Sequence, residues 1–305
     1  GVPNRKAAKA SSMANTRDIR RRIKSVKNTM QITKAMQMVA ASKMKKAQDI
    51  ALSGRPYALL LADILGSLGG MDLSSSELPF FQRRDVKNRG ILVVSSDKGL
   101  CGALNANLFR HLTKQEGNCC YVALGKRGAQ FVSRTKRDLL ADFPLSDNAS
   151  FSEVRPAVEF LIRAFIEKKI DTVEVLYTNF INTLRQEPEV IQLLPVVDVS
   201  TMLETLRKRF GQKDAALPKD GREIHFEPDR EKILAELAAL YFKQEVYQLV
   251  LEAKASEHSA RMVAMKSATD NAKSLIDDLT LEYNRVRQAS ITQEILEISA
   301  AAFAK

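Results

Sequence analysis

Near the N-terminus, in residues 15–53, apolar and small residues recur at alternating steps of four and three. This spacing puts them on one side of an α-helix and is typical of a coiled-coil seam. The predicted seam runs through Ile19, Ile23, Val26, Met30, Thr33, Gln37, Ala40, Met44, Ala47 and Ala51. Because residues 15–53 contain no glycine or proline, the pattern predicts one helix that begins at Asn15 or Thr16 and stops at Gly54 and Pro56.

The C-terminal part of the chain, residues 229–305, contains no glycine or proline over 77 positions. At about 1.5 Å per residue, a helix of this length reaches roughly 115 Å. It carries a second seam with steps of three and four, formed by Met262, Met265, Thr269, Ala272, Ile276, Leu279, Tyr283, Val286 and Ser290. The two seams match, so we expect the two helices to pack against each other as an antiparallel pair.

Between these helices the pattern changes to short apolar runs rich in β-branched residues. The predicted strands lie at residues 90–95, 120–124 and 172–177, with a further strand near 190–197. Helical patterns separate them, at residues 102–113, 127–140 and 152–169. Alternating strands and helices favour a mostly parallel sheet, as in Rossmann-like domains. Pro218, Gly221 and Pro228 predict a loop before the long helix.

These patterns predict an α/β fold combined with a long coiled coil, divided into four segments. Residues 1–12 are basic and small and resemble a leader remnant or a cloning remnant. Residues 13–55 form the first long helix, residues 56–228 a globular α/β domain, and residues 229–305 the second long helix. At 305 residues the chain is long enough for more than one structural unit.

The two predicted helices differ in length, with 39 residues against 77, so the longer one should project by tens of ångströms beyond the shorter. Its free end is apolar nearly all round, with Ile291, Ile295, Leu296, Ile298 and Phe303. Such an end needs surrounding protein, so we expect an apolar sleeve made by other chains. The alternative is a frayed or self-associating end.

The net charge of +11 suggests an anionic partner. Residues 13–50 hold ten basic and two acidic side chains, so most of the excess lies on the first helix. Nucleic acid is one candidate, but aromatic residues for base stacking are missing there. Acidic protein surfaces attract such a face equally well. No run of about 18 apolar residues could span a bilayer.

Candidate chemistry in the sequence is weak. The glycine-bearing turn at residues 95–105 follows a strand and precedes a helix, but it matches neither nucleotide-binding glycine motif. Cys101 could act as a nucleophile with His111 or His258 as its base, although no spacing supports the pairing. Cys119 and Cys120 are sequence neighbours, which argues against a disulfide framework and for a reducing compartment. We expect no catalytic residue, no metal site and no cofactor.

Three segments together resemble the gamma subunits of F-type ATP synthases. The first is residues 23–44, which read IKSVKNTMQITKAMQMVAASKM, and the second is residues 96–105, SDKGLCGALN. The third runs from SEHSARM at residues 256–262 through ATDNA at 268–272 to YNRVRQASITQEI at 283–295. Both ends of the chain match in order and in length, whereas the middle is similar only in layout.

The resemblance implies a rotary shaft that couples ion-driven rotation of a membrane c-ring to ATP synthesis or hydrolysis on beta subunits. Its partners would be the alpha and beta subunits, an epsilon-type subunit (delta in mitochondria) and the c-ring. By motif, the contacts with beta fall on Lys34, Met36, Arg287, Gln288, Thr292 and Glu294. Glu227 would approach the c-ring. Charge reversal at Lys34 and Lys43 is expected to alter coupling.

The resemblance also implies a non-catalytic subunit, peripheral on an energy-transducing membrane. That membrane would be a bacterial plasma membrane, on its cytoplasmic face, or a mitochondrial inner membrane, on its matrix face. The paired regulatory cysteines of chloroplast forms are absent, so no thiol switch of that kind is expected. Two other readings stay open: a coiled-coil scaffold that binds nucleic acid, and a nucleotide-using enzyme built on the α/β domain.

Overall fold

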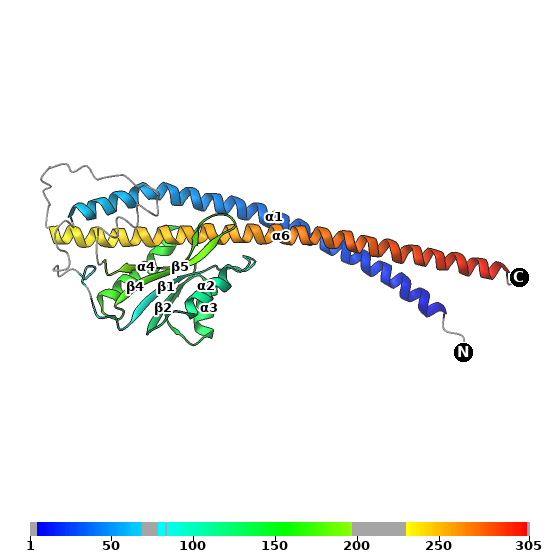
Figure 1. Ribbon diagram of the computed structural model, residues 1–305, viewed down its shortest axis with the longest axis horizontal. Helices are drawn as coiled ribbons and strands as arrows, with labels where there is room; N and C mark the ends of the chain where they lie inside the picture. The colour runs from blue at the N-terminus through cyan, green and yellow to red at the C-terminus, as the bar shows by residue number, and fades with distance from the viewer. Residues whose placement is uncertain (1–4, 69–78, 83, 197–229, 304–305) are drawn as a thin grey trace. The chain divides into compact units, whose positions relative to one another are not determined.

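The computed structural model describes residues 5–68, 79–82, 84–196 and 230–303. They divide into two compact units, which we call the helical unit (Gly1–Val39 with Met262–Lys305) and the sheet unit (Ala40–Arg261). Each of the two long helices contributes to both units (Figure 1). The four-segment division drawn from the sequence therefore stays a hypothesis about which parts of the chain fold independently.

The first long helix, α1, spans Arg5–Leu68 and the second, α6, spans Arg230–Phe303. The predicted end of the first helix at Gly54 and Pro56 is wrong, because α1 continues through both residues. A proline inside a helix costs about 3 kcal/mol. The turns beyond it bury Ala58, Leu59 and Leu61 in the core, and burial of each leucine contributes about 1.5–3 kcal/mol. Tertiary packing thus outweighs the local breaking signal.

This extension changes the comparison of the two helix lengths. α1 has 64 residues and α6 has 74. The difference of ten residues corresponds to about 15 Å. The predicted excess of tens of ångströms is therefore wrong, since it came from ending the first helix too early and beginning it too late.

In the helical unit, both predicted seams are confirmed by burial. Every seam position of α1 from Ile19 to Gln37, and every seam position of α6 from Met262 to Ser290, is buried or half-buried. Ile19, Met265 and Leu279 are almost fully covered. Thr33 and Thr269 meet across the seam, with 2.8 Å between their hydroxyl oxygens. The two threonines, which are polar gaps in the seams, thus pair with each other.

The sheet unit contains five strands: β1 (Arg89–Val94), β2 (Cys119–Leu124), β3 (Asp138–Phe143), β4 (Thr172–Phe180) and β5 (Gln186–Leu194). Their order across the sheet is β3-β2-β1-β4-β5. The first four strands are parallel and β5 pairs antiparallel with β4, which confirms a mostly parallel sheet. The chain order reverses between β1 and β4, as in doubly wound folds.

One strand was missed because the predicted helix over residues 127–140 was too long. Helix α3 covers only Lys126–Arg134. The chain leaves it at Lys136, whose φ of +54° is left-handed, and the N–H groups of Lys136 and Arg137 bond back to helix carbonyls. The next residues form β3, an edge strand whose side chains alternate between exposed and half-buried. Half-burial weakens the apolar signal that identifies a strand.

Helices cover both faces of the sheet (Figure 1). On one face, α2 (Leu104–Thr113) and α3 pack on side chains such as Ile91, Val93 and Tyr121. On the other face, α4 (Phe151–Ile166) and α6 close the larger core. Here α6 lies between α1 and the sheet (Figure 1), and nearly every residue from Tyr241 to Arg261 is buried or half-buried. The predicted loop at Pro218, Gly221 and Pro228 lies outside the described residues.

Candidate functional site

The residues that the resemblance singles out lie mostly on the outer surface of the helical unit. Lys34, Arg287, Gln288 and Thr292 are exposed, whereas Met36 and Glu294 are half-buried. The hydroxyl of Thr292 donates to the carbonyl of Gln288 one turn earlier, at 2.9 Å. Four of the six side chains are therefore open to a partner. Glu227 lies outside the described residues.

These six residues form two groups and not one site. The contact between Thr33 and Thr269 places Lys34 level with the α6 residues around Thr269. Gln288 follows Thr269 by 19 residues, which is roughly 30 Å along a helix. Lys34 and Met36 therefore form one contact region, and residues 287–294 form a second one towards the C-terminus.

The C-terminal part of α6 carries uncovered apolar side chains. Ile295, Leu296 and Ile298 are 57%, 64% and 71% exposed, and Ile291 is 43% exposed. Leu281 is also exposed, further back along the helix. Isolated apolar residues are normal on a surface, but a run of them on one helix end marks an interaction site.

The sheet unit holds a different constellation, which sequence reasoning did not identify as a site. At the carboxyl edge of the sheet, the α6 segment of residues 254–261 is fastened to three loops. Ser256 donates to the carbonyl of Thr178 at the end of β4, and Ser259 donates to that of Thr183, each at 2.9 Å. His258 Nε2 lies 3.4 Å from the carbonyl of Asp147 after β3. We call this segment the α6 clamp.

Arg261 makes the third attachment of the α6 clamp, to the loop after β1. Its guanidinium donates to the carbonyl of Gly99 at 3.2 Å and approaches that of Lys98 at 3.5 Å. It also donates to Glu257 at 2.8 Å, and Lys254 donates to the same carboxylate at 2.9 Å. Burial raises the pKa of Glu257, but the charges and hydrogen bonds of the two cations outweigh it and the pKa is lowered. Glu257 is therefore a paired, ionised carboxylate inside the protein.

Asp147 connects the clamp region to α1. Its carboxylate accepts from Lys43 at 2.6 Å and from Lys98 at 3.1 Å. The hydrogen bond from Lys43 is the main reason that the pKa of Asp147 is held well below its usual range, against the opposing effect of burial. Lys43 is thus engaged inside the sheet unit. The expectation that charge reversal at Lys43 alters coupling stays a prediction, and such a reversal would also remove this internal ion pair.

The turn at residues 95–105 is occupied by the protein's own groups. Asn105 donates to Ser96 Oγ at 2.7 Å and approaches Cys101 Sγ at 3.4 Å. Ser96 Oγ in turn donates to the carbonyl of Lys98. Together with Arg261, these contacts fill the crevice beside β1 where doubly wound folds place ligands. The geometry therefore gives no support to a phosphate-binding turn.

The cysteines behave as packing residues. Cys101 and Cys120 are buried and all three cysteines are free thiols. Burial, followed by the neighbouring Asp138, raises the pKa of Cys120 to about 11, so it is a thiol at neutral pH. The ring nitrogens of His258 face Asp147 and Arg261, so His258 is not directed at Cys101 as its base. Within the described residues, no group of three or more metal-binding side chains comes together.

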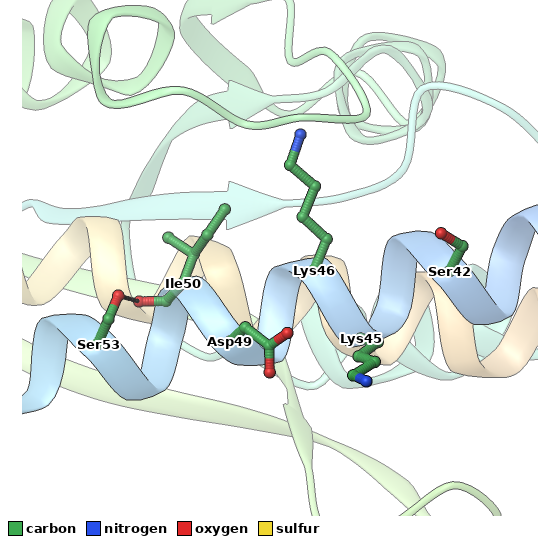
Figure 2. A pocket seen from close by; sticks show the side chains of 6 residues that line it. All are labelled: Ser42, Lys45, Lys46, Asp49, Ile50 and Ser53. Carbon is green, nitrogen blue, oxygen red and sulfur yellow. Dashed lines mark hydrogen bonds between the residues drawn. The ribbon is translucent and has the colours of Figure 1, made fainter.

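A shallow depression of about 430 Å³ runs along α1, lined by Ser42, Lys45, Lys46, Asp49, Ile50 and Ser53. Figure 2 shows that the side chains of Lys45 and Lys46 point in opposite directions. The hydroxyl of Ser53 donates to the carbonyl of Ile50, one turn earlier on the same helix. The lining groups diverge, so the depression offers no convergent set of ligands.

The sequence of the α6 clamp contains an unusual group of polar and charged residues. Residues 254–261 combine Lys, Glu, His, Arg and two serines in a helix whose preceding turns are largely apolar. Polar residues all round a helix usually indicate a solvent-exposed stretch. Here they are buried: Lys254 and Glu257 pair within α6, whereas the two serines, His258 and Arg261 contact β4 or loops that are distant in sequence, which periodicity cannot reveal.

Comparisons with known proteins agree with the fold. Residues 15–304 match the model of the ATP synthase family. The ATP synthase gamma chain of Opitutus terrae is 56% identical over 292 residues, covering 96% of this chain and 99% of that one. The gamma chain of Methylacidiphilum infernorum is 46% identical over 301 residues, with the same coverage.

Chains of solved ATP synthase structures have a similar fold. A chain of the Tetrahymena thermophila mitochondrial ATP synthase central stalk and c-ring superposes with a TM-score of 0.56 at 25% identity, covering 78% of this chain and 99% of that one. A chain of the Euglena gracilis mitochondrial OSCP/F1/c-ring assembly has a TM-score of 0.64 at 17% identity, covering 95% of this chain and 94% of that one.

Proposed function

The chain belongs to the ATP synthase gamma-chain family, and from this we propose how it works as the rotor of the central stalk. The observation that carries the proposal is the uncovered apolar end of α6, where Ile295, Leu296 and Ile298 are more than half exposed. A run of exposed apolar side chains at a helix end marks a surface that other protein covers. A sleeve formed by alternating alpha and beta subunits supplies such a surrounding.

The chain itself catalyses nothing in this proposal. Its helical unit presents different side chains on different sides, so rotation brings each beta subunit against a different surface in turn. A surface that binds one conformation of beta better than another shifts the equilibrium between them, and with it the affinity for nucleotide. Lys34 and Met36 form one coupling region, and Arg287, Gln288, Thr292 and Glu294 form the second.

The sheet unit and the segment around Glu227 would face the membrane rotor. We propose that Glu227 approaches the c-ring and that an epsilon-type subunit binds beside the sheet. The helices of the described chain include none that is long and apolar enough to cross a membrane. We therefore propose attachment to an energy-transducing membrane through the other subunits, on the cytoplasmic or matrix face.

Reversing one charge tests the coupling role. In the reconstituted complex, Lys34→Glu should lower the number of protons pumped per ATP hydrolysed while hydrolysis continues, because an exposed attractive contact with beta becomes repulsive. The matched control is Lys87→Glu, an exposed lysine of the sheet unit. Equal pumping ratios in the wild type and in both variants would count against the coupling region at Lys34.

Lys43→Glu does not test the coupling role of the α1 charges separately from the stability of the sheet unit. It would break the contact with Asp147 within the sheet unit. Any change in coupling could then arise from this internal contact, so Lys34 is the better position.

A further inference from the structure

His258 is buried in the α6 clamp, with 1% of its surface exposed. Its Nδ1 lies 3.4 Å from Nη1 of Arg261. A guanidinium can only donate hydrogen bonds, so Nδ1 must be the unprotonated acceptor. The ring proton is then on Nε2, which faces the carbonyl of Asp147 at 3.4 Å. The contacts therefore select a neutral imidazole with one defined tautomer.

The charged groups around His258 come from four parts of the sheet unit. α6 contributes Lys254, Glu257 and Arg261, and α1 contributes Lys43. The loops after β1 and β3 contribute Lys98 and Asp147. Four cations and two carboxylates make the region positive before the histidine gains a proton.

This environment opposes the imidazolium form. Burial is the main reason that the pKa of His258 is lowered, and the charges of Lys254 and Arg261 act in the same direction. The charge of Glu257 and the hydrogen bond to the Asp147 carbonyl act in the opposite direction but do not outweigh them.

Protonation would have a definite structural consequence. A second ring proton on Nδ1 would point at the guanidinium of Arg261, which has no lone pair to accept it. The same guanidinium holds the carbonyls of Lys98 and Gly99. Displacing Arg261 therefore loosens residues 96–101, the loop that follows the central strand β1.

We propose that His258 is a proton-operated latch that fastens α6 to the loops after β1 and β3 when neutral and releases the loop after β1 when protonated. The latch is a property of the folded chain and does not depend on the proposed function. In a rotor, acidification would weaken the attachment of α6 to the loop after β1.

The direction of the pH effect follows from linkage. A histidine whose pKa is lowered on folding stabilises the closed state above its ordinary pKa, about 6.5. That stabilisation is lost as the pH falls through this value towards the lower folded pKa. The loss amounts to about tenfold in the closing equilibrium for each unit of difference between the two pKa values.

The test uses the full-length chain without partners. Amide hydrogen exchange, expressed as protection factors, is measured for residues 96–101 at about pH 7.5 and about pH 5, which bracket the titration range of histidine. Protection of this loop should fall at the lower pH in the wild type. In His258→Gln, which cannot gain a proton, the protection of this loop should not change with pH. His111→Gln, at a half-buried histidine of α2, should behave like the wild type.

A second measurement needs no variant to fold. The ring proton resonances of His258 in the wild type report its titration by NMR, and His258 should titrate below the ordinary pKa of histidine, about 6.5. The proposal is overturned if His258 titrates at an ordinary value, or if it titrates while the protection of residues 96–101 stays constant. Neither outcome would affect the rotor proposal, which rests on assembly and coupling.

Discussion

Glu257 is the buried carboxylate that balances two cations, Lys254 and Arg261. Replacing it in Glu257→Gln removes the negative charge and leaves both cations buried without compensation. We expect a loss of about 3–5 kcal/mol in the free energy of unfolding, measured by urea denaturation. The control is Glu159→Gln, whose ion pair with Arg155 is exposed to solvent and should contribute little. Similar stabilities of the two variants would show that the cluster tolerates an unbalanced charge.

Asp147 should make stability depend on pH in the acid range. Its pKa is lowered by Lys43 and Lys98, so its contribution is present above its usual pKa of about 3.9 and is lost as the pH falls below that value. Asp147→Asn should lower the free energy of unfolding at neutral pH by about 1 kcal/mol, since the pair is partly exposed.

Urea denaturation at several pH values checks this prediction. The difference between wild type and Asp147→Asn should begin to shrink as the pH falls through about 4, because the carboxylate of the unfolded chain then takes up a proton while that of the folded chain stays ionised. A difference that stays constant with pH would mean that the carboxylate charge is not responsible.

At the scale of elements, α1 is a helix that continues through a proline. Pro56→Ala restores the backbone N–H that proline lacks and removes the ring clash with the preceding turn. We expect a gain of about 1–3 kcal/mol in stability, measured by urea denaturation, with slightly more helix by circular dichroism. A loss would indicate that the backbone geometry imposed by Pro56 is needed to bring Leu59 and Leu61 into the core.

Elements with a clear internal period were predictable from the chain alone. The seams through Thr33 and Thr269 match their pattern because one periodic side of each helix is covered. The strands β1, β2 and β4 match theirs because both faces are covered, so each reads as a nearly continuous apolar run. The end of α1 and the strand β3 were not predictable in this way. The first depends on burial of residues beyond Pro56, and the second is half-exposed at the edge of the sheet.

At the scale of the whole molecule, the exposed end of α6 is a place where assembly with other subunits can be tested without changing the folding of the chain. Leu296→Asp combined with Ile298→Asp should leave the melting temperature of the isolated chain unchanged, because both side chains are exposed in it. Assembly with the alpha and beta subunits should weaken, since charges would enter an apolar sleeve. Leu184→Asp, at another exposed leucine on the β4–β5 connection, is the control.

Co-purification with the alpha and beta subunits provides the measurement. Weaker recovery of the double variant, together with normal recovery of Leu184→Asp, is the expected result. Equal recovery of all three proteins would contradict a sleeve around the α6 end.

By itself, the sequence determined the two seams, the mostly parallel sheet and the apolar end of the last helix, because each depends on the spacing of residues close together in the chain. Its motifs also identified the family resemblance. Only the tertiary structure decided that α1 continues through Pro56, that Lys43 is held by Asp147, and that His258 and Arg261 are buried against loops more than a hundred residues away. Such contacts depend on which loops the folded sheet brings to one edge. Local sequence patterns do not show which distant loops will lie together there.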